Sequence, residues 1–523
     1  MHVDPATTLS QPQTTLYRPS RDEQLRQAIL IWSLTALAFV LHACVAGRYH
    51  MFRNELYFLV CGRHPAFGYV DQPPLVPLLA AATQLFGLHT WLLRLPAALA
   101  AVAIVPLSAE FTRLLGGRTV SVALAAVAAV IAPGLAGLTA TLTTSTFEPL
   151  AWTACAYFVA RAVIRDDHRA WLWAGLVAGL SMEAKYGIVM WLLGIFAGFV
   201  LTASRGVLRR RNCWFGIAIA AAIAAPSVIW QAVHGWPFLA VIFEHHIAGT
   251  NFTGTPLIFE IGQILAMNLL LAPLWVAGVV APFLVKELKP ARFLSIAFVG
   301  ATAINLAAGG KDYYLFAAYP TMFAVGAVAL ARLKSWVVAL WLILATANFA
   351  IAAPLALPIL TPPALAHYLA RTHIRPRPDE AAAVGAPLTQ VFSDEMGWHA
   401  LEKRVAAIYH SLPVSEQKRA AILATNYGEA AAIDVYGQAD GLPPAICGQN
   451  QYYLWGPHGH EGSVIIHING DPNLWRHFCG SVESAGAFGS PYAMPYENGR
   501  PIFICRGLRF SLVKAWPHFK RYQ

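Results

Sequence analysis

The sequence predicts a mostly α-helical, polytopic membrane protein with a small exported α/β domain at its C-terminal end. Hydrophobic residues make up 57% of the 523 residues and charged residues only 12%, with a mean hydropathy of +0.51. Soluble proteins carry about 25% charged residues. Apolar stretches long enough to cross a bilayer recur up to residue 357, and the composition after that point is mixed.

About eleven stretches are apolar enough to be membrane spans, since a helix needs about 20 residues to cross the hydrocarbon. The stretch 170–184 is short, and 258–285 is long enough to tilt strongly or to carry an additional surface helix. The predicted spans are 27–47, 91–113, 119–138, 147–165, 170–184, 187–204, 213–231, 258–285, 292–308, 313–331 and 336–357.

Basic side chains orient these spans, because cytoplasmic loops are enriched in Lys and Arg. With this set of spans, every basic cluster falls on the cytoplasmic side, the N-terminus is cytoplasmic, and everything after residue 357 is exported. The clusters are Arg21 and Arg26, Arg113 and Arg118, 161–169, 205–211, 286–292, and Arg332 and Lys334. They explain most of the net charge of +10, which therefore indicates contact with anionic membrane lipids and not nucleic-acid binding.

The first residues lack the basic start, short apolar core and small-residue cleavage site of a signal peptide. The first apolar segment is therefore expected to be a retained anchor. The long exported loop 48–90 is expected to be functional. Within it, 51–61 has helical spacing and is expected to lie in the membrane interface with its aromatic side chains facing lipid.

Residues 358–523 contain turn signals and short β-like runs that alternate with helical stretches, which is typical of a small α/β domain. The chain is therefore divided into a membrane domain, 1–357, and an exported domain, 358–523. The β-like runs are 420–425, 463–468 and 501–505, and the helical stretches lie near 394–409 and 428–435. A disulfide among Cys447, Cys479 and Cys505 is compatible with export, but the sequence does not pair them.

A set of charged and histidine side chains falls at the exported ends of spans or in exported loops. These residues are Glu55, Asp71, Glu148, Lys185, Glu244, His245, His246, Lys311 and Asp312. Ionisable groups are costly near hydrocarbon, so such a set indicates a functional site. A transporter more often places these groups near the bilayer midplane, whereas a cluster at the outer surface suits chemistry on a lipid headgroup.

Each of these residues also has a purely structural interpretation. Glu55 can be a solvated surface side chain, and Glu148 can stabilise a helix N-terminus through the dipole. Lys185 and Lys311 can snorkel to the interface, and the histidine pair can be interfacial imidazoles. The set as a whole favours a functional site.

The order of these pieces resembles the polyprenyl-phosphate-sugar-dependent glycosyltransferases, which include protein mannosyltransferase-like enzymes and bacterial aminoarabinose transferases of lipid A. Two pieces of the tail, ATNYGEAAAIDVYG at 424–437 and GQNQYYLWGP at 448–457, resemble a bacterial subgroup of this family. The other matching pieces are RNELYFL at 53–59, GYVDQPPL at 68–75, TTSTFEPL at 143–150, AKYG at 184–187, EHH at 244–246 and GKDYYLFAAYP at 310–320.

The resemblance implies the GT-C architecture, with about 11–13 transmembrane helices, a catalytic first outward loop and an exported domain. It also implies a bacterial inner (plasma) membrane protein. The implied reaction transfers a hexosyl or pentosyl group, with inversion, from a polyprenyl-phosphate carrier to an envelope acceptor. That acceptor is a glycolipid such as lipid A or lipopolysaccharide, a polysaccharide or a protein.

The residues suit this chemistry. An acceptor hydroxyl needs a carboxylate to take its proton, and either Glu55 or Glu148 can supply it. The leaving phosphate needs cations and polar donors. The residues expected to hold it are Lys185, Lys311, Tyr313 and Tyr314.

Two departures from the family pattern bear on the site. Relatives usually carry a catalytic Asp at the position of Asn54, whose amide cannot accept a proton as a carboxylate does. Gln72 stands where relatives often have a basic residue or His. In some relatives an acid equivalent to Asp71 and a loop histidine bind a divalent metal, so Asp71 with His245 or His246 is a candidate zinc or magnesium site.

Three functions follow from these observations. The leading hypothesis is a glycosyltransferase that uses a polyprenyl-phosphate-linked sugar. A transporter or flippase of lipid-linked sugars is the second; ionisable residues deep in the spans would favour it, and the sequence shows few of them. A catalytically silent protein that binds lipid-linked sugar is the third, prompted by Asn54.

Overall fold

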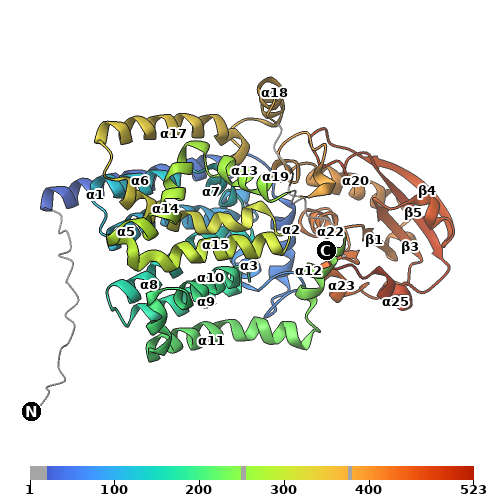
Figure 1. The fold of residues 1–523 in the computed structure, drawn as a ribbon. Helices are drawn as coiled ribbons and strands as arrows, with labels where there is room; N and C mark the ends of the chain where they lie inside the picture. The colour runs from blue at the N-terminus through green and yellow to red at the C-terminus, as the bar shows by residue number, and fades with distance from the viewer. Residues whose placement is uncertain (1–19, 249–254, 375–377, 379) are drawn as a thin grey trace, which may run out of the picture.

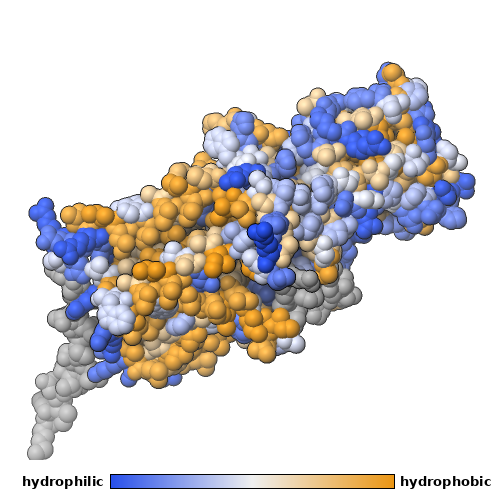
Figure 2. Space-filling view, turned by 90° about the horizontal axis from the view of Figure 1, so that it is seen from above, coloured by the Kyte–Doolittle hydropathy of each residue, from blue (hydrophilic) through white to orange (hydrophobic). Residues whose placement is uncertain are grey.

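The computed structural model describes residues 20–248, 255–374, 378 and 380–523. A bundle of helices makes up the first two thirds of the chain, and a five-stranded sheet with its helices lies at the end of the bundle opposite the start of the first helix (Figure 1). Figure 2 shows hydrophobic side chains over much of the bundle surface and mainly hydrophilic ones over the sheet-containing part.

The helices of the bundle follow one another with short connections. Their bounds are α1 Arg21–Val45, α2 Arg53–Arg63, α3 Leu75–Gln84, α4 Thr90–Leu93, α5 Leu95–Leu114, α6 Thr119–Val130, α7 Pro133–Leu138, α8 Glu148–Ile164, α9 Ala170–Ala184, α10 Ile188–Val200, α11 Arg211–Val233, α12 Pro237–Ala248, α13 Pro256–Ala266, α14 Ala272–Leu284, α15 Arg292–Ala307, α16 Tyr319–Leu330 and α17 Ser335–Ala356.

The chain is a multi-pass membrane protein, as expected. Among the described residues, six helices are long and apolar enough to cross a membrane, or up to eight if each bent helix pair is one span. The expected count of about eleven is higher because it treated three stretches as full spans. In the structure, 119–138 breaks at Pro133, and the helices in 147–165 and 170–184 have 17 and 15 residues.

Small residues bring neighbouring helices into backbone contact. A Cβ added to Gly175 of α9 would lie 2.1 Å from the carbonyl oxygen of Gly216 in α11. A Cβ on Gly194 of α10 would lie 2.5 Å from the carbonyl oxygen of Ala297 in α15. Close approach at glycine is a common way to pack helices in membranes, where burial of apolar surface gives little drive for association.

Several of the basic side chains expected on the cytoplasmic side gather at one end of the bundle. Arg113 at the end of α5 donates to Gln27 near the start of α1, with an Nε–Oε1 distance of 2.9 Å. Arg165 after α8 donates to the carbonyl of Leu114, and Arg210 before α11 pairs with Asp166. These loops therefore lie beside the beginning of α1, at the end of the bundle away from the sheet (Figure 1).

The C-terminal sheet has the order β2-β1-β3-β5-β4. Strands β1, β2 and β3 are parallel to one another, and β5 pairs antiparallel with both β3 and β4. The strands are β1 Ala420–Ala424, β2 Ala445–Cys447, β3 Val464–Ile468, β4 Cys479–Phe488 and β5 Arg500–Leu508. The helices around them are α18 Pro362–Thr372, α19 Gln390–Ser393, α20 Trp398–Ser411, α21 Val414–Gln417, α22 Tyr427–Tyr436, α23 Asn450–Trp455, α24 Pro472–Trp475 and α25 Leu512–Ala515.

The three predicted strands are present as β1, β3 and β5, and the two predicted helices as α20 and α22. Strands β2 and β4 were not predicted. Strand β2 has only three residues, and β4 is an edge strand whose ten residues include two glycines and are mostly exposed. Neither strand has the apolar alternation from which strands are recognised.

A disulfide between Cys479 and Cys505 joins β4 to β5, and Cys447 is a free, buried thiol. The sequence had left this pairing open. The bridge ties the edge strand to its neighbour over a loop of 26 residues in sequence, which in the loop-entropy model stabilises the fold by roughly 3 kcal/mol.

Helix α2 joins the bundle to the sheet-containing part. Its Tyr57 and Phe58 are 1% and 3% exposed and belong to the same core as α22 and the sheet. The predicted helix at 51–61 is therefore present, but the prediction that its aromatic side chains face lipid was wrong, because they are buried in this core. On the opposite side α2 packs closely on α3, because a Cβ on Gly62 would lie 2.4 Å from the carbonyl oxygen of Pro77.

A fully buried arginine fixes the start of α2. The Nε and Nη2 atoms of Arg94 each lie 2.9 Å from an oxygen of Glu55, and Nη2 lies 2.9 Å from Oε2 of Glu395. Arg94 also donates to the carbonyls of Ala46 and His50. Three chain segments far apart in sequence thus bind the same guanidinium. Burial raises the pKa of Glu395 to about 7, although the nearby cation lowers it.

We expect Arg94→Met to lower the free energy of unfolding by about 3–5 kcal/mol, because two buried carboxylates lose their cation. Thermal unfolding of the purified protein in detergent measures this as a fall in Tm. The matched control is Arg332→Met, whose partner Glu287 is exposed and whose loss should cost at most about 1 kcal/mol. Equal stability of the two variants would contradict the structural role of Arg94.

Candidate functional site

The candidate site lies where α2 meets the C-terminal part, and Asn54 lies at its centre. The hydroxyl of Tyr427, at the N-terminus of α22, donates to Oδ1 of Asn54 at 2.8 Å. Among the described residues, Nδ2 of Asn54 has no hydrogen-bond partner. This amide group therefore remains able to donate to a bound molecule.

Glu55 lies next to Asn54 in sequence but is fully engaged elsewhere. Its Oε1 accepts from Arg94 and from the backbone N–H of Leu142, and its Oε2 accepts from Arg94 and from the N–H of Phe52. The side chain is buried and caps its own helix. This geometry favours a structural role for Glu55 over the predicted role of proton acceptor.

Asp71 lies beside the Asn54 contact. The ring of Tyr57 packs on that of Tyr427 with centroids 4.8 Å apart. The hydroxyl of Tyr57 donates to Oδ1 of Asp71 at 2.9 Å, and the amide of Asn450 donates to Oδ2 at 3.2 Å. Burial raises the pKa of Asp71 to about 6, although both hydrogen bonds oppose the shift. A carboxylate with such a pKa is suited to accept a proton near neutral pH.

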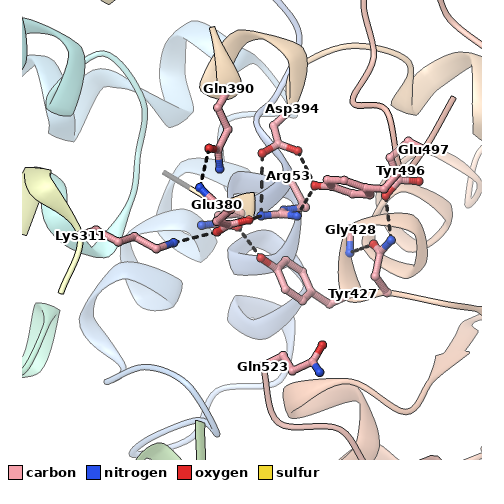
Figure 3. Close-up of polar contacts among 12 residues, drawn as sticks. Arg53, Lys311, Glu380, Gln390, Asp394, Tyr427, Gly428, Tyr496, Glu497 and Gln523 are labelled. Atoms are coloured by element: carbon pink, nitrogen blue, oxygen red, sulfur yellow. Dashed lines mark hydrogen bonds and ion pairs between the residues drawn. The ribbon is translucent and has the colours of Figure 1, made fainter. Parts of the chain in front are cut away.

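Arg53 is the hub of a second group of contacts, drawn in Figure 3. Its guanidinium pairs with Glu380 at 3.6 Å and with Asp394 at 3.8 Å, and it donates to the hydroxyl of Tyr496. Lys311 pairs with the same Glu380 at 2.7 Å from the other side. Glu380 therefore bridges two cations that come from separate parts of the chain.

Gly428 at the start of α22 makes room for Arg53. A Cβ at this position would lie 2.5 Å from Cγ of Arg53. The guanidinium also lies 5.3 Å from the ring centroid of Tyr427, within the range of cation–π attraction. The first turn of α22 therefore positions Arg53 as well as Asn54.

Lys185, at the end of α9, forms a third group with the start of α8. Its Nζ lies 3.0 Å from Oε2 of Glu148 and 2.7 Å from the hydroxyl of Ser145. It also lies 3.9 Å from the ring centroid of Tyr314 and 5.5 Å from that of Tyr313. The predicted partners Glu148, Lys185, Tyr313 and Tyr314 are thus brought together.

The three groups come from neighbouring stretches of the chain, and we refer to their residues together as the polar surface of the site. Tyr313 and Tyr314, which contact Lys185, lie two and three residues after Lys311, so the chain links the Lys185 group to the Arg53 group. Arg53 in turn is next to Asn54. All the predicted donor-binding residues belong to this surface, whose three cations are Arg53, Lys185 and Lys311. Glu55 does not belong to it.

The predicted metal site has less support. Both oxygens of Asp71 already accept hydrogen bonds, and the side chains of His245 and His246 lie outside the described residues. Glu244 in the same helix accepts a hydrogen bond from the backbone N–H of Tyr522. In the part of the chain that the structure describes, no three His, Cys, Asp or Glu side chains are grouped to hold a metal. The metal site stays a prediction.

Several residues of the site were not found from the sequence. Arg94 could have been, because an arginine within a predicted span needs a partner. Arg53 stood in a quoted motif without a role. Tyr427 and Asn450 also lay in quoted motifs, but nothing in the sequence placed them against α2. Glu380 and Tyr496 lie in segments without any recognisable pattern, and Asp394 stood at the start of a predicted helical stretch without a role.

Comparisons with known proteins identify the fold. Residues 71–230 match the family model described as dolichyl-phosphate-mannose-protein mannosyltransferase. The apo structure of ArnT from Cupriavidus metallidurans matches with a TM-score of 0.61 and 13% identity, over 92% of this chain and 98% of that one. The ArnT structure bound to undecaprenyl phosphate matches with a TM-score of 0.58 and 13% identity, over 91% and 97%. No curated protein matches the chain by sequence.

The chain therefore has the ArnT-like GT-C glycosyltransferase fold, as the resemblance implied. The matched segment 71–230 includes Asp71, Glu148 and Lys185, which the structure places in the site. The likeness to ArnT extends over nearly the whole of both chains.

The raised pKa of Asp71 gives a pH-dependent prediction. A carboxyl group whose pKa rises from its ordinary 3.8 to about 6 on folding stabilises the fold below pH 3.8. This contribution, roughly 3 kcal/mol, is lost as the pH rises through 6. Asp71→Asn removes this titration. The Tm of the variant, measured relative to that of the wild type, should therefore rise between pH 4 and pH 7.5.

The control for this measurement is Asp471→Asn, at the exposed N-terminus of α24. It should follow the wild-type pH profile throughout. A constant Tm difference between Asp71→Asn and the wild type across this range would show that folding does not raise the pKa of Asp71.

Proposed function

We propose that the protein transfers a hexosyl or pentosyl group from a polyprenyl-phosphate carrier to a cell-envelope acceptor, with inversion at the anomeric carbon. The observation that supports this most directly is the polar surface formed by Arg53, Lys185 and Lys311 beside Asn54, in a GT-C fold. The bound lipid of the matching ArnT structure is undecaprenyl phosphate, which is consistent with a lipid-phosphate donor here.

In the proposed reaction the acceptor oxygen attacks the anomeric carbon and forms the new glycosidic bond. The bond from that carbon to the phosphate oxygen breaks, and its electron pair leaves with the lipid phosphate. Lys185, Lys311 and the Tyr313 and Tyr314 side chains stabilise this charge, which is most effective when the cations are already in place. Glu148 and Ser145 hold the Lys185 ammonium in position.

The proton of the acceptor goes to a carboxylate. Glu55 is tied to Arg94, so Asp71 and Glu148 are the carboxylates that we assign to this step. Asp71 is linked to Asn54 through the Tyr57 and Tyr427 pair. Asn54 itself orients the acceptor or the sugar by donating from its free amide group.

The proposed acceptor is a glycolipid such as lipid A or lipopolysaccharide, a polysaccharide or a protein. We place the membrane domain at 1–357 and the exported domain at 358–523, in a bacterial inner membrane with a cytoplasmic N-terminus. The gathering of Arg113, Arg165 and Arg210 at the end of the bundle away from the sheet supports this orientation, because basic loops remain cytoplasmic.

A catalytically silent protein that binds lipid-linked sugar is the second candidate. It is favoured by Asn54, which replaces the expected acid, and by Glu380, which already neutralises Lys311 and Arg53. The same polar surface would then bind the lipid phosphate without transfer.

Loss of either phosphate-binding cation should reduce transfer strongly. With polyprenyl-phosphate sugar as donor, Lys185→Met and Lys311→Met should each lower kcat/KM by about 10²–10³. A radiolabelled-sugar transfer assay with purified protein in detergent measures this. Lys418→Met, at an exposed position before β1, is the matched control and should retain wild-type activity. Full activity in both site variants would refute the phosphate site.

The proton acceptor is identified by a second set of variants. If Asp71 or Glu148 is the base, its variant, Asp71→Asn or Glu148→Gln, should lower kcat by about 10²–10⁴. If Glu148 only orients Lys185, Glu148→Gln should mainly raise the KM of the donor. Full activity in both variants would contradict this assignment. An inert wild type that becomes active as Asn54→Asp would establish the silent protein.

A further inference from the structure

A separate pocket of about 440 Å³ lies near the C-terminal end of α2. Its size is within the range of sites that bind small molecules, about 300–1,000 Å³. Its wall combines apolar side chains such as Val60, Ile433 and Leu442 with polar and aromatic ones. The latter are Arg63, His64, Asp434, Tyr452, Trp455 and His458.

The one carboxylate of this wall is satisfied by the protein itself. Oδ1 of Asp434 accepts from the backbone N–H of Ala445 at 2.8 Å, and Oδ2 accepts from the hydroxyl of Tyr452 at 2.7 Å. Burial also raises the pKa of Asp434 to about 6. Asp434 therefore already has both oxygens engaged by donors of the protein itself.

The basic groups of the wall keep unused hydrogen-bonding capacity. Arg63 donates from Nε to Gln84 and from Nη1 to the carbonyl of Asp434. Its Nη2, the Nε2 of His64 and the ring of His458 make no hydrogen bond with any described residue. Three nitrogen-bearing groups thus converge on a pocket whose carboxylate is internally paired, and this favours an anionic ligand.

The aromatic side chains add flat apolar surfaces. Trp455 lies 4.8 Å from the ring of His64 and 4.9 Å from that of Tyr452, measured between centroids. Aromatic rings beside hydrogen-bonding groups suit a ligand that has both an apolar face and many polar substituents. A sugar ring that carries a phosphate or carboxylate has this combination.

The pocket and the candidate site share their supporting helices. Asn54 and His64 lie at opposite ends of α2, roughly 15 Å apart along its axis. Helix α22 supplies Tyr427 to the site and Asp434 to the pocket, and α23 supplies Asn450 to the site and Trp455 to the pocket. A molecule bound in the pocket would therefore be held in a fixed relation to Asn54.

We propose that this pocket binds an acidic sugar ring of the acceptor, with Arg63, His64 and His458 on the acidic group and Tyr452 and Trp455 beside the ring. The assignment to the acceptor rests on the proposed transferase function, whereas the binding itself does not.

Direct binding measurements test whether the pocket binds an acidic sugar. In isothermal titration calorimetry of the full-length protein in detergent, glucuronate and glucose 6-phosphate should bind at least ten times more tightly than glucose. The double variant His64→Gln/His458→Gln should lose at least tenfold in affinity for both acids. Both side chains are exposed, so the variant should fold, and its Tm confirms this. The control His477→Gln, at an exposed position near α24, should bind like the wild type.

Two results would overturn the binding proposal. One is that neither acid binds more tightly than glucose. The other is that the folded double variant binds both acids as the wild type does.

Transfer kinetics test the assignment to the acceptor. With an acidic glycan as acceptor, the double variant should raise the KM of the acceptor at least tenfold, and by a larger factor than it lowers kcat. An unchanged acceptor KM, with normal transfer, refutes the acceptor assignment. Acid-specific binding in a wild type that transfers no sugar would instead support the pocket and refute the transferase proposal.

Discussion

The buried guanidinium of Arg94 is the constraint on which the rest of this structure depends. It joins Glu55 in α2 to Glu395 in the C-terminal part, with both carboxylates out of contact with water. Removing charges from water is costly unless each finds a partner with good geometry. The three side chains therefore have to come together, and they place the start of α2, with Asn54 and Arg53, at the boundary between the bundle and the sheet.

The chemistry of the candidate site follows from this placement. One part of the site comes from the bundle, with Glu148, Lys185 and the Lys311 segment, and the other part comes from the first turns of α22 and α23. These turns follow β1 and β2 at the carboxyl ends of parallel strands, where α/β sheets usually bind ligands. A site built from both parts suits the proposed transfer between two bound molecules.

The sequence was sufficient to predict the class of fold, because hydropathy and periodicity are properties of local segments. The central pieces of the site could also be located, since Glu148, Lys185 and Lys311 are ionisable residues at the ends of apolar stretches. Glu55 shows where such reasoning stops. Its role depends on Arg94, which is 39 residues away, and on the position of Glu395, which is 301 residues from Arg94. No local pattern contains that information, and the same holds for Tyr427 opposite Asn54.

The length of helix α2 sets the distance and the angle between the residues at its two ends. One end presents Asn54 and the other presents Arg63 and His64, and each successive residue of a helix turns by about 100°. A single inserted or deleted residue in the middle of α2 would keep one end in place and rotate the other away from its partners. A change of length within this short helix therefore disturbs more contacts than a change in the loops on either side, whose length can vary without changing which side chains meet.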